Sequence, residues 1–143
     1  MPSPTFNDSS RRTFLKASTT AALATTALAV PRAVHAAGDD VIKVGLVGCG
    51  GRGTGAANQA LAADKGTRLV AMGDAFADRL QLSLGSLGRQ EGISDQIDVP
   101  QQRQFIGFDA YQKVIEQCDV VLLATPPGFR PAHLKAAVAA GKH

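Results

Sequence analysis

The sequence predicts an α/β fold built on a doubly wound parallel sheet. Between residues 41 and 143, four apolar runs of strand length alternate with four stretches of helical periodicity. Strands joined by helical crossovers give this alternation, and their right-handed connections place helices on both faces of one sheet. A glycine-rich segment follows the first run, and an aspartate ends the second. Both features fall at the carboxyl ends of strands, where sheets of this class bind ligands.

The first strand and its turn contain the segment Val-Gly-Leu-Val-Gly-Cys-Gly-Gly-Arg-Gly at 44–53. The run Val41–Val47 is almost continuously apolar, which predicts a buried parallel strand. Gly48, Gly50 and Gly53 have the G-x-G-x-x-G spacing. In that pattern the first glycine makes a tight turn, the second lets backbone approach a pyrophosphate, and the third lets the helix pack against the strand.

The helix after this turn is expected to hold an anion, because its first amide groups have no partner within the helix. A glycine turn of purely structural role is the alternative, but the strand–turn–helix–strand context favours dinucleotide binding. Four small or apolar residues are predicted on one face of this helix: Ala56, Ala57, Ala60 and Leu61. Gly66 is predicted at the C′ position that ends it.

Asp74 ends the second apolar run and follows Gly53 by 21 residues. An acidic residue at an interval of ~20 residues binds the ribose hydroxyls in this fold. Its carboxylate would repel a 2′-phosphate, and Ala75 and Phe76 follow it instead of an arginine. NAD is therefore expected in preference to NADP. Asp74 is also a suitable N-cap for a helix that starts near Phe76, and both roles can hold together.

The later elements follow from the same periodicities. One buried helix face is predicted from Phe76, Leu80, Leu84 and Leu87. The polar segment 88–102 is expected to be a loop or surface insertion, and Gln104–Ile106 a short third strand. Asp109 is a candidate cap for a helix whose apolar side chains are Tyr111, Val114 and Ile115.

The most apolar run, Asp119–Ala124, predicts the fourth strand, which the prolines after Thr125 end. Thr125, Pro126 and Pro127 are expected either to border the nicotinamide half of a dinucleotide or only to stop the strand. The final helix is predicted to face the sheet with Leu134, Ala137, Val138 and Gly141.

Residues 1–36 are predicted to be a twin-arginine export signal, which leaves 37–143 as the mature domain. Ser10–Lys16 reads Ser-Arg-Arg-Thr-Phe-Leu-Lys and matches the S-R-R-x-F-L-K pattern. The apolar stretch Ala17–Val30 is shorter than the ~20 residues that span a bilayer. Residues 34–36 fit cleavage after Ala36. The prediction is a periplasmic protein without membrane association; a chance basic patch before a short helix is the alternative.

Composition argues against several other classes of function. Removal of residues 1–36 would take four of the 15 basic residues and one of the 12 acidic ones, which leaves a balanced charge. No basic surface for nucleic acid is then expected. Cys49 and Cys118 fall at opposite ends of parallel strands and are expected to stay unpaired, since a disulfide needs Cα atoms within ~7 Å. The three histidines show no metal-ligand spacing.

In this order the motifs resemble the Gfo/Idh/MocA oxidoreductases, the relatives of glucose–fructose oxidoreductase and inositol dehydrogenase. The resemblance covers roughly 41–143. Besides the export signal and the glycine segment, it rests on Gly73-Asp74, Gly107-Phe108-Asp109-Ala110-Tyr111, Ala124-Thr125-Pro126-Pro127 and Gly141-Lys142-His143. It implies a Rossmann-type dinucleotide domain followed by a C-terminal domain built on an open antiparallel sheet.

The resemblance also implies which residues contact the cofactor: Gly48, Gly50, Gly51, Arg52, Gly53, Asp74, Thr125 and Pro126. Many relatives have histidine where this chain has Arg130. His133 lies one helical turn further on, and it is expected to be a surface residue rather than a substitute. No catalytic residue and no metal ligand is identified.

The implied activity is hydride transfer between a nicotinamide cofactor and a sugar, polyol or related hydroxyl compound. Two alternatives stay open: an NAD-dependent glycoside hydrolase of the same superfamily and a non-catalytic NAD-binding module. In relatives the Gly-Lys-His segment leads into a further strand that ends in Glu-Lys-Pro. The chain is therefore expected to be a truncated product or partial sequence with an incomplete sheet, inactive alone, and without the C-terminal domain through which relatives form homo-oligomers.

Overall fold

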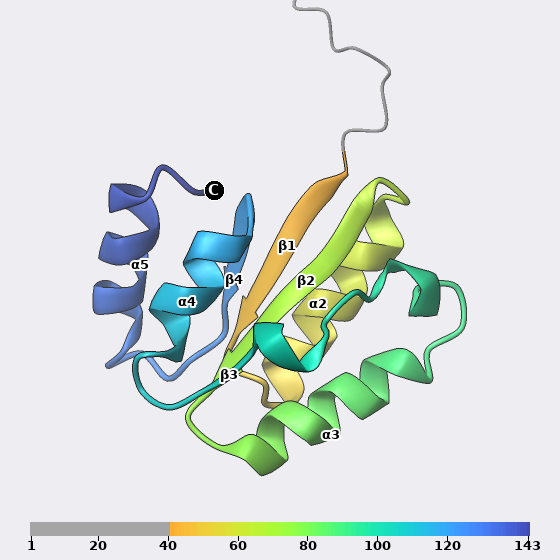
Figure 1. The fold of residues 1–143 in the computed structure, drawn as a ribbon, viewed down its shortest axis with the longest axis horizontal. Coiled ribbons are helices and arrows are strands. Elements are labelled where there is room, and N and C mark those ends of the chain that lie inside the picture. Colours follow the sequence, from red (N-terminus) through yellow and green to blue (C-terminus); the bar gives the residue numbers. More distant parts are fainter. Residues whose placement is uncertain (1–40) are drawn as a thin grey trace, which may run out of the picture. The chain divides into compact units, whose positions relative to one another are not determined.

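Four parallel strands form one sheet in the order β3-β2-β1-β4 (Figure 1). They are β1 (Ile42–Val47), β2 (Thr67–Asp74), β3 (Gln104–Ile106) and β4 (Val120–Leu123). The computed structural model describes residues 41–143, so the predicted export signal at residues 1–36 lies outside the described residues. Within residues 41–143, no helix is long and apolar enough to cross a bilayer.

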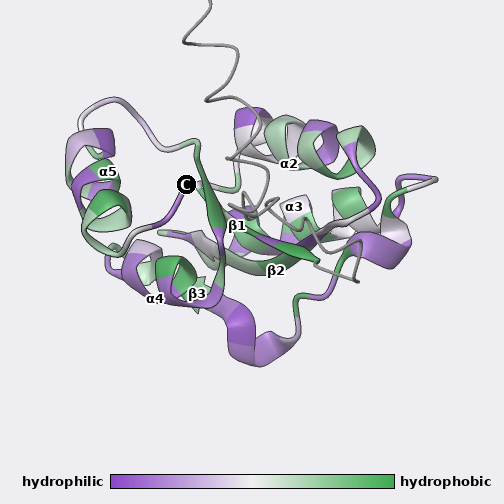
Figure 2. Ribbon diagram, turned by 90° about the horizontal axis from the view of Figure 1, so that it is seen from above, coloured by the Kyte–Doolittle hydropathy of each residue, from purple (hydrophilic) through white to green (hydrophobic). Residues whose placement is uncertain are grey.

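Helices cover both faces of this sheet, which confirms the doubly wound α/β fold. The α-helices are α2 (Gly51–Ala63), α3 (Ala77–Gly88), α4 (Ala110–Gln117) and α5 (Arg130–Ala139). Figure 2 shows α2 and α3 on one face and α4 and α5 on the other. The chain crosses from β3 at one edge to β4 at the other, so the order of the strands reverses beside β1. Such a reversal opens a crevice at the carboxyl ends of the strands.

Two apolar clusters hold the layers together, one on each face of the sheet. The cluster between the sheet and the helices α2 and α3 contains Val44, Leu46, Leu61, Leu69, Met72, Leu80 and Leu87. The cluster between the sheet and α4 contains Val47, Val70, Ala71, Val114 and Cys118. Burial of one such leucine or methionine stabilises the fold by about 1.5–3 kcal/mol. The alternation along β1 is regular, as expected for a strand buried on both faces.

A bulge in β2 explains why Val70 and Ala71 both lie in the α4 cluster. Val44 of β1 pairs with Leu69, but Gly45 pairs with Ala71, so Val70 is the extra residue. Two consecutive side chains of β2 therefore face the same side. Gly45 lies opposite this bulge, where a Cβ would come within 2.7 Å of Val114 Cγ1. Only glycine at position 45 lets α4 pack this closely.

The segment 88–102 is an irregular and mostly exposed connection, as predicted, but three of its side chains pack into the domain. It contains the 3₁₀ helix η1 (Ser94–Gln96), and a second 3₁₀ helix, η2 (Gln101–Arg103), begins at its end. Ile93 and Val99 enter the core, and the side-chain Nε2 of buried Gln96 lies 2.9–3.0 Å from the carbonyl oxygens of Leu61, Asp64 and Thr67. The Gln96 side chain thereby links the end of α2 to the start of β2. The polar sequence of this segment gives no indication of that buried contact.

Two helix ends differ from the sequence expectation. Gly66 has no positive φ, and α2 ends at Ala63 with Asp64 as its extended C-cap. The glycine that does end a helix is Gly141, whose φ is +66°. Its amide donates to Val138 O and that of Lys142 donates to Ala137 O, which is the Schellman arrangement. Only glycine adopts this conformation without strain.

The capping prediction at Asp109 is right for the position and wrong for the interaction. Asp109 is the N-cap residue of α4, but its side chain makes no capping hydrogen bond. Its carboxylate Oδ2 instead lies 3.4 Å from Lys113 Nζ, and both side chains are more than half exposed. An exposed pair of this kind contributes at most ~0.5 kcal/mol.

The buried face of α5 is predicted correctly only in part. Ala137 is buried as predicted, and so is His133, whereas Leu134 and Val138 are 57% and 67% exposed. The sheet explains this result, because β4 is an edge strand whose four residues are all half-buried. Beyond β4, His143 N donates to Asp119 O and Val121 N donates to His143 O, a ladder of parallel type. The apolar pattern of α5 therefore includes residues that this four-stranded sheet leaves uncovered.

Candidate functional site

The glycine turn after β1 lies against the ends of β2 and β4. Gly48 has φ +94°, and a Cβ there would come within 2.8 Å of Ala124 C and 2.9 Å of Thr125 N. Its amide donates to Gly73 O at 2.8 Å. Conformation and space both require glycine at position 48. Through its contacts with Gly73, Ala124 and Thr125, the turn brings the carboxyl ends of three strands together.

The other glycines of the motif divide into packed and open positions. A Cβ on Gly53 would lie 1.8 Å from Gly48 O, so Gly53 sets the contact between α2 and β1. In contrast, a Cβ on Gly50 or Gly51 would meet no atom within 4 Å. The space in front of the first turn of α2 is therefore open, and the amide groups of that turn face it. A helix N-terminus of this kind attracts anions.

Asp74 is fixed at the end of β2 by two backbone amides. Its Oδ2 accepts a hydrogen bond from Cys49 N at 2.6 Å, and its Oδ1 accepts one from Phe76 N at 3.0 Å. Each carboxylate oxygen keeps a second lone pair for a ligand. Helix α3 has Phe76 as its N-cap residue, so the N-cap interpretation of Asp74 is wrong, although the carboxylate does hold the Phe76 amide.

Thr125 and Pro126 follow β4 on the other side of the turn. Ala124 N donates to Val47 O at 2.8 Å, which continues the ladder between β1 and β4. The hydroxyl of Thr125 lies 3.2 Å from Nδ1 of His133. The backbone carbonyl oxygen of Thr125 accepts a 2.7 Å hydrogen bond from Nε of Arg130. His133 is 6% exposed, so the expectation of a surface histidine is wrong.

One cleft of about 490 Å³ at the carboxyl ends of the strands unites most of the residues named from the sequence. Gly48, Gly50, Arg52, Asp74, Thr125 and Pro126 line it. Gly51 lines a neighbouring groove instead, and Gly53 lines neither. The volume is in the range of small-molecule sites.

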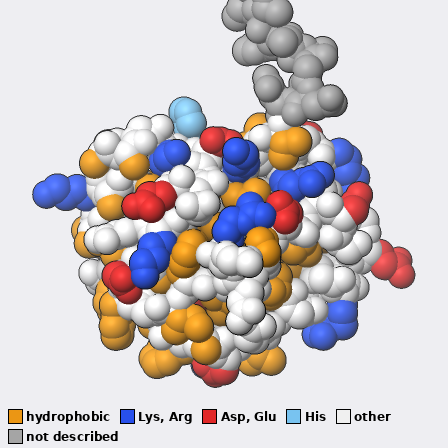
Figure 3. All heavy atoms as spheres, viewed as in Figure 1, with side chains coloured by type: hydrophobic (Ala, Val, Ile, Leu, Met, Phe, Trp, Pro, Cys, Tyr) orange, Lys and Arg blue, Asp and Glu red, His pale blue; other side chains and the backbone are white. Residues whose placement is uncertain are grey.

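Aromatic side chains that the sequence analysis did not assign to the site form one wall of this cleft. Phe108 and Phe129 are 72% and 45% exposed, and their ring centroids are 6.0 Å apart. Tyr111 stacks on His133 with centroids 4.2 Å apart. Figure 3 shows apolar side chains gathered along the lower edge of the domain, where the strands end. Two of these residues, Phe108 and Tyr111, belong to the segment 107–111, which is one of the motifs of the family resemblance.

Charge in the cleft is predominantly positive. Three arginines line it, Arg52, Arg79 and Arg130, against the single carboxylate of Asp74. Arg79 stands five residues after Asp74 on α3 and lies outside the motifs from which the site was predicted. Among residues 41–143 the Arg79 side chain makes no ion pair or hydrogen bond, so its charge is available to a ligand.

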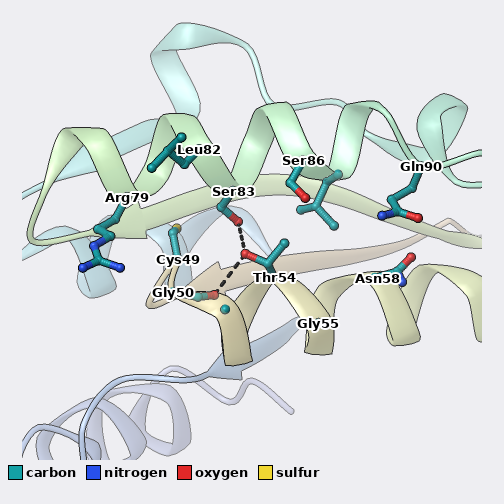
Figure 4. A pocket seen from close by; sticks show the side chains of 12 residues that line it. Cys49, Gly50, Thr54, Gly55, Asn58, Arg79, Leu82, Ser83, Ser86 and Gln90 are labelled. Atoms are coloured by element: carbon teal, nitrogen blue, oxygen red, sulfur yellow. Dashed lines mark hydrogen bonds between the residues drawn. The ribbon is translucent and has the colours of Figure 1, made fainter.

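A second groove, of about 390 Å³, runs between α2 and α3 (Figure 4). Thr54 Oγ1 donates to Gly50 O at 3.0 Å and lies 2.7 Å from Ser83 Oγ. This contact joins the two helices behind the glycine turn. Arg79 lines both the cleft and the groove, so it stands where the two spaces meet.

Ionisation in the site follows from burial. Burial and the charge of Asp74 raise the pKa of the Cys49 thiol to about 12, so this cysteine is not a nucleophile at neutral pH. Burial lowers the pKa of His133, which keeps the ring neutral at pH 7. Cys49 and Cys118 are both unpaired, as predicted, and residues 41–143 contain no cluster of side chains suited to a metal ion.

Comparison with known proteins identifies the family. The model of the Gfo/Idh/MocA oxidoreductase family, with an NAD-binding Rossmann fold, matches residues 42–143. A search of curated protein sequences gives no match.

Solved structures share the fold. An apo scyllo-inositol dehydrogenase from Lactobacillus casei is 22% identical, with a TM-score of 0.53 over 73% of this chain and 27% of that one. A structure of scyllo-inositol dehydrogenase from the same organism, with bound NAD(H) and scyllo-inositol, is 25% identical, with a TM-score of 0.51 over 72% and 26%. Biliverdin reductase from Synechocystis sp. PCC 6803, in complex with biliverdin and NADP+, is 23% identical, with a TM-score of 0.52 over 71% and 28%.

The chain spans about a quarter of the length of these solved structures. The parallel sheet, the glycine turn and the family match agree. The chain belongs to the Gfo/Idh/MocA oxidoreductase family, whose NAD-binding Rossmann fold residues 42–143 form.

Proposed function

We propose that the cleft at the carboxyl ends of the strands binds a nicotinamide dinucleotide. The observation that carries the proposal is the placement of Asp74, whose carboxylate is held by the amides of Cys49 and Phe76 next to the open N-terminus of α2. The diphosphate would meet the amide groups of Gly50, Gly51 and Arg52, and the adenosine ribose would meet Asp74.

The remaining residues named from the sequence have supporting roles in this proposal. Gly48 and Gly53 shape the turn and leave no room for side chains. Thr125 and Pro126 border the cleft from β4. Three arginines around the cleft favour a ligand with two negative charges on its diphosphate.

NAD is the proposed cofactor, in preference to NADP. A 2′-phosphate next to the ribose would stand against the carboxylate of Asp74 and cost the complex a like-charge contact. Arg79 lines the same cleft and opposes that repulsion in part. The preference is therefore expected to be a matter of affinity rather than complete exclusion.

The whole protein is proposed to be an oxidoreductase that transfers hydride between the nicotinamide and a hydroxyl compound of the sugar or polyol class. The family match supports the reaction type, and one solved structure of the same fold contains NAD(H) and scyllo-inositol. The nicotinamide supplies the hydride chemistry, and the protein supplies binding and orientation. We assign no proton-transfer residue within 41–143.

Export by the twin-arginine route is part of the proposal and rests on the sequence of residues 1–36. A fusion of residues 1–40 to a reporter that is active only after folded export tests it. Replacement of Arg11 and Arg12 by lysine should abolish export, and unchanged export of that variant would contradict the assignment.

Binding is tested by titrating the 143-residue chain with NAD while its thermal unfolding midpoint is measured. The proposed contacts lie on the diphosphate and the adenosine half, so ADP-ribose should raise the midpoint as NAD does, because each stabilises the native state by mass action. Nicotinamide mononucleotide, which lacks that half, should raise it much less. An unchanged midpoint with saturating NAD and ADP-ribose would refute the proposal.

A further inference from the structure

Thr125, two residues after the end of β4, is held by two side chains of α5. Nε of Arg130 donates to its backbone carbonyl oxygen at 2.7 Å, and Nδ1 of His133 lies 3.2 Å from its hydroxyl oxygen. The arginine therefore holds the backbone of this threonine, and the histidine holds its side chain. Backbone and side chain are thus fixed separately.

Thr125 packs against the glycine turn and lines the cleft. A Cβ on Gly48 would lie only 2.9 Å from the amide nitrogen of Thr125, which shows that Thr125 packs directly against the glycine turn. Thr125 and Asp74 line the same cleft; Thr125 follows β4 and Asp74 is the last residue of β2, with the glycine turn after β1 between them. A threonine hydroxyl has one donor hydrogen and two acceptor lone pairs. With one of these used by His133, the others remain for a ligand in the cleft.

His133 is itself immobilised, which makes it a suitable support. Its ring stacks on Tyr111 of α4, with centroids 4.2 Å apart and planes 24° apart, and on Phe129, with centroids 6.2 Å apart. The residue is 6% exposed, and it borders the cleft beside Thr125. The hydrogen bond to Thr125 is the polar contact that the structure gives this ring. Either atom can be the donor, according to the tautomer of the neutral ring.

We infer that His133 is a positioning residue for the dinucleotide: it acts through the hydroxyl of Thr125, which it holds in one rotamer facing the cleft. This inference rests on the proposed function. Without His133 the hydroxyl would sample several staggered rotamers, and binding would have to select one of them. Fixing one side chain in advance changes affinity by about threefold to tenfold.

The test is a double-mutant cycle on NAD affinity in the full chain. Thr125→Val keeps the shape of the side chain and removes the hydroxyl, and His133→Leu removes the ring nitrogens. Each is expected to weaken NAD binding about threefold to tenfold. Because one residue acts through the other, the double variant should bind NAD no more weakly than Thr125→Val alone. Multiplied effects in the double variant would overturn the inference.

A conservative variant separates positioning from packing. His133→Asn places an amide atom near the position of Nδ1, so it should recover most of the lost affinity, whereas His133→Leu should not. If His133→Leu does not fold, His133→Asn made in the wild-type chain and in the Thr125→Val variant still forms a cycle. Any remaining loss in His133→Asn should then vanish once the hydroxyl is absent, and a loss that persists there would overturn the inference.

The outcome also distinguishes this inference from the function on which it rests. Wild-type chain that binds NAD, with variants that bind it equally well, would overturn the role of His133 and leave the cofactor site intact. Wild-type chain that binds neither NAD nor ADP-ribose would overturn both.

Discussion

The carboxylate of Asp74 and the backbone amide of Cys49 form a 2.6 Å hydrogen bond between the end of β2 and the turn after β1. A second bond, from Phe76 N to the other carboxylate oxygen, fixes the plane of the carboxylate. Asp74 therefore has a structural role before any ligand arrives. The bond to Cys49 also orients the glycine turn, so the proposed ribose contact and the proposed diphosphate contact both depend on this one interaction.

Gly53→Ala should destabilise the fold by about 1–3 kcal/mol or more, because overpacking a dense contact costs that much and the new methyl group would lie 1.8 Å from Gly48 O. Gly55→Ala is the matched control in the same helix, since its Cβ meets no atom within 4 Å. That change should stabilise α2 by about 0.5–1 kcal/mol. Urea unfolding measures both, and equal effects of the two substitutions would contradict the packing role of Gly53.

Gly50→Val should leave the fold almost intact but weaken NAD binding at least tenfold. Gly50 has extended backbone that any residue adopts, and its Cβ direction is open. A valine side chain would occupy the space proposed for the diphosphate. Affinity and unfolding midpoint are measured on the same sample. Wild-type affinity in a folded Gly50→Val protein would place the diphosphate elsewhere.

His133 should make stability fall on acidification. Its pKa is lowered by burial in the native state, so below the ordinary value of about 6.5 the unfolded chain binds the proton more readily. This contribution is complete above pH 6.5 and declines as the pH falls towards the native pKa. In His133→Asn the free energy of unfolding should depend less on pH between about 7 and 5. Parallel pH profiles for the two proteins would show that the histidine does not titrate as its burial requires.

Asp74→Ser should raise the affinity for NADP relative to NAD, because it removes the charge that repels a 2′-phosphate. Arg79 lines the same cleft and is free to pair with that phosphate. Adding Arg79→Ala to Asp74→Ser should then remove the gain for NADP and change NAD affinity little. The ratio of the two dissociation constants is the measurement, and a gain that survives without Arg79 would assign phosphate binding to another group.

Much of the fold was predictable because its signals are local. The apolar runs mark the four strands, and the spacing of Gly48, Gly50 and Gly53 predicts the turn whose geometry the structure shows. The position of Asp74 at the end of β2 follows from the length of one strand–helix–strand unit.

The misplaced features depend on partners far away in the sequence. Gln96 bonds carbonyl groups 29 to 35 residues earlier in the chain, and nothing in its own neighbourhood indicates that it is buried. The face of α5 could not be read from its apolar residues, because which of them is covered depends on how far the sheet extends beyond β4.

The aromatic wall of the cleft was missed for a related reason. Phe108 follows β3 and Phe129 precedes α5, and they meet only because the chain crosses the sheet between them. His133 was misjudged because a histidine on an amphipathic helix is usually at the surface, whereas here Tyr111 of α4 covers it.

The most direct test of the account is the affinity of Asp74→Asn for NAD. The amide keeps the shape of the side chain but loses the charge proposed to strengthen its hydrogen bonds to the ribose, and its NH2 group can no longer accept a hydrogen bond from one of the two backbone amides of Cys49 and Phe76. Affinity should therefore fall about tenfold or more. Asp78→Asn, four residues later in the first turn of α3, is the control and should bind NAD like the wild type. A folded Asp74→Asn protein with wild-type NAD affinity would contradict the central claim that this carboxylate binds the cofactor.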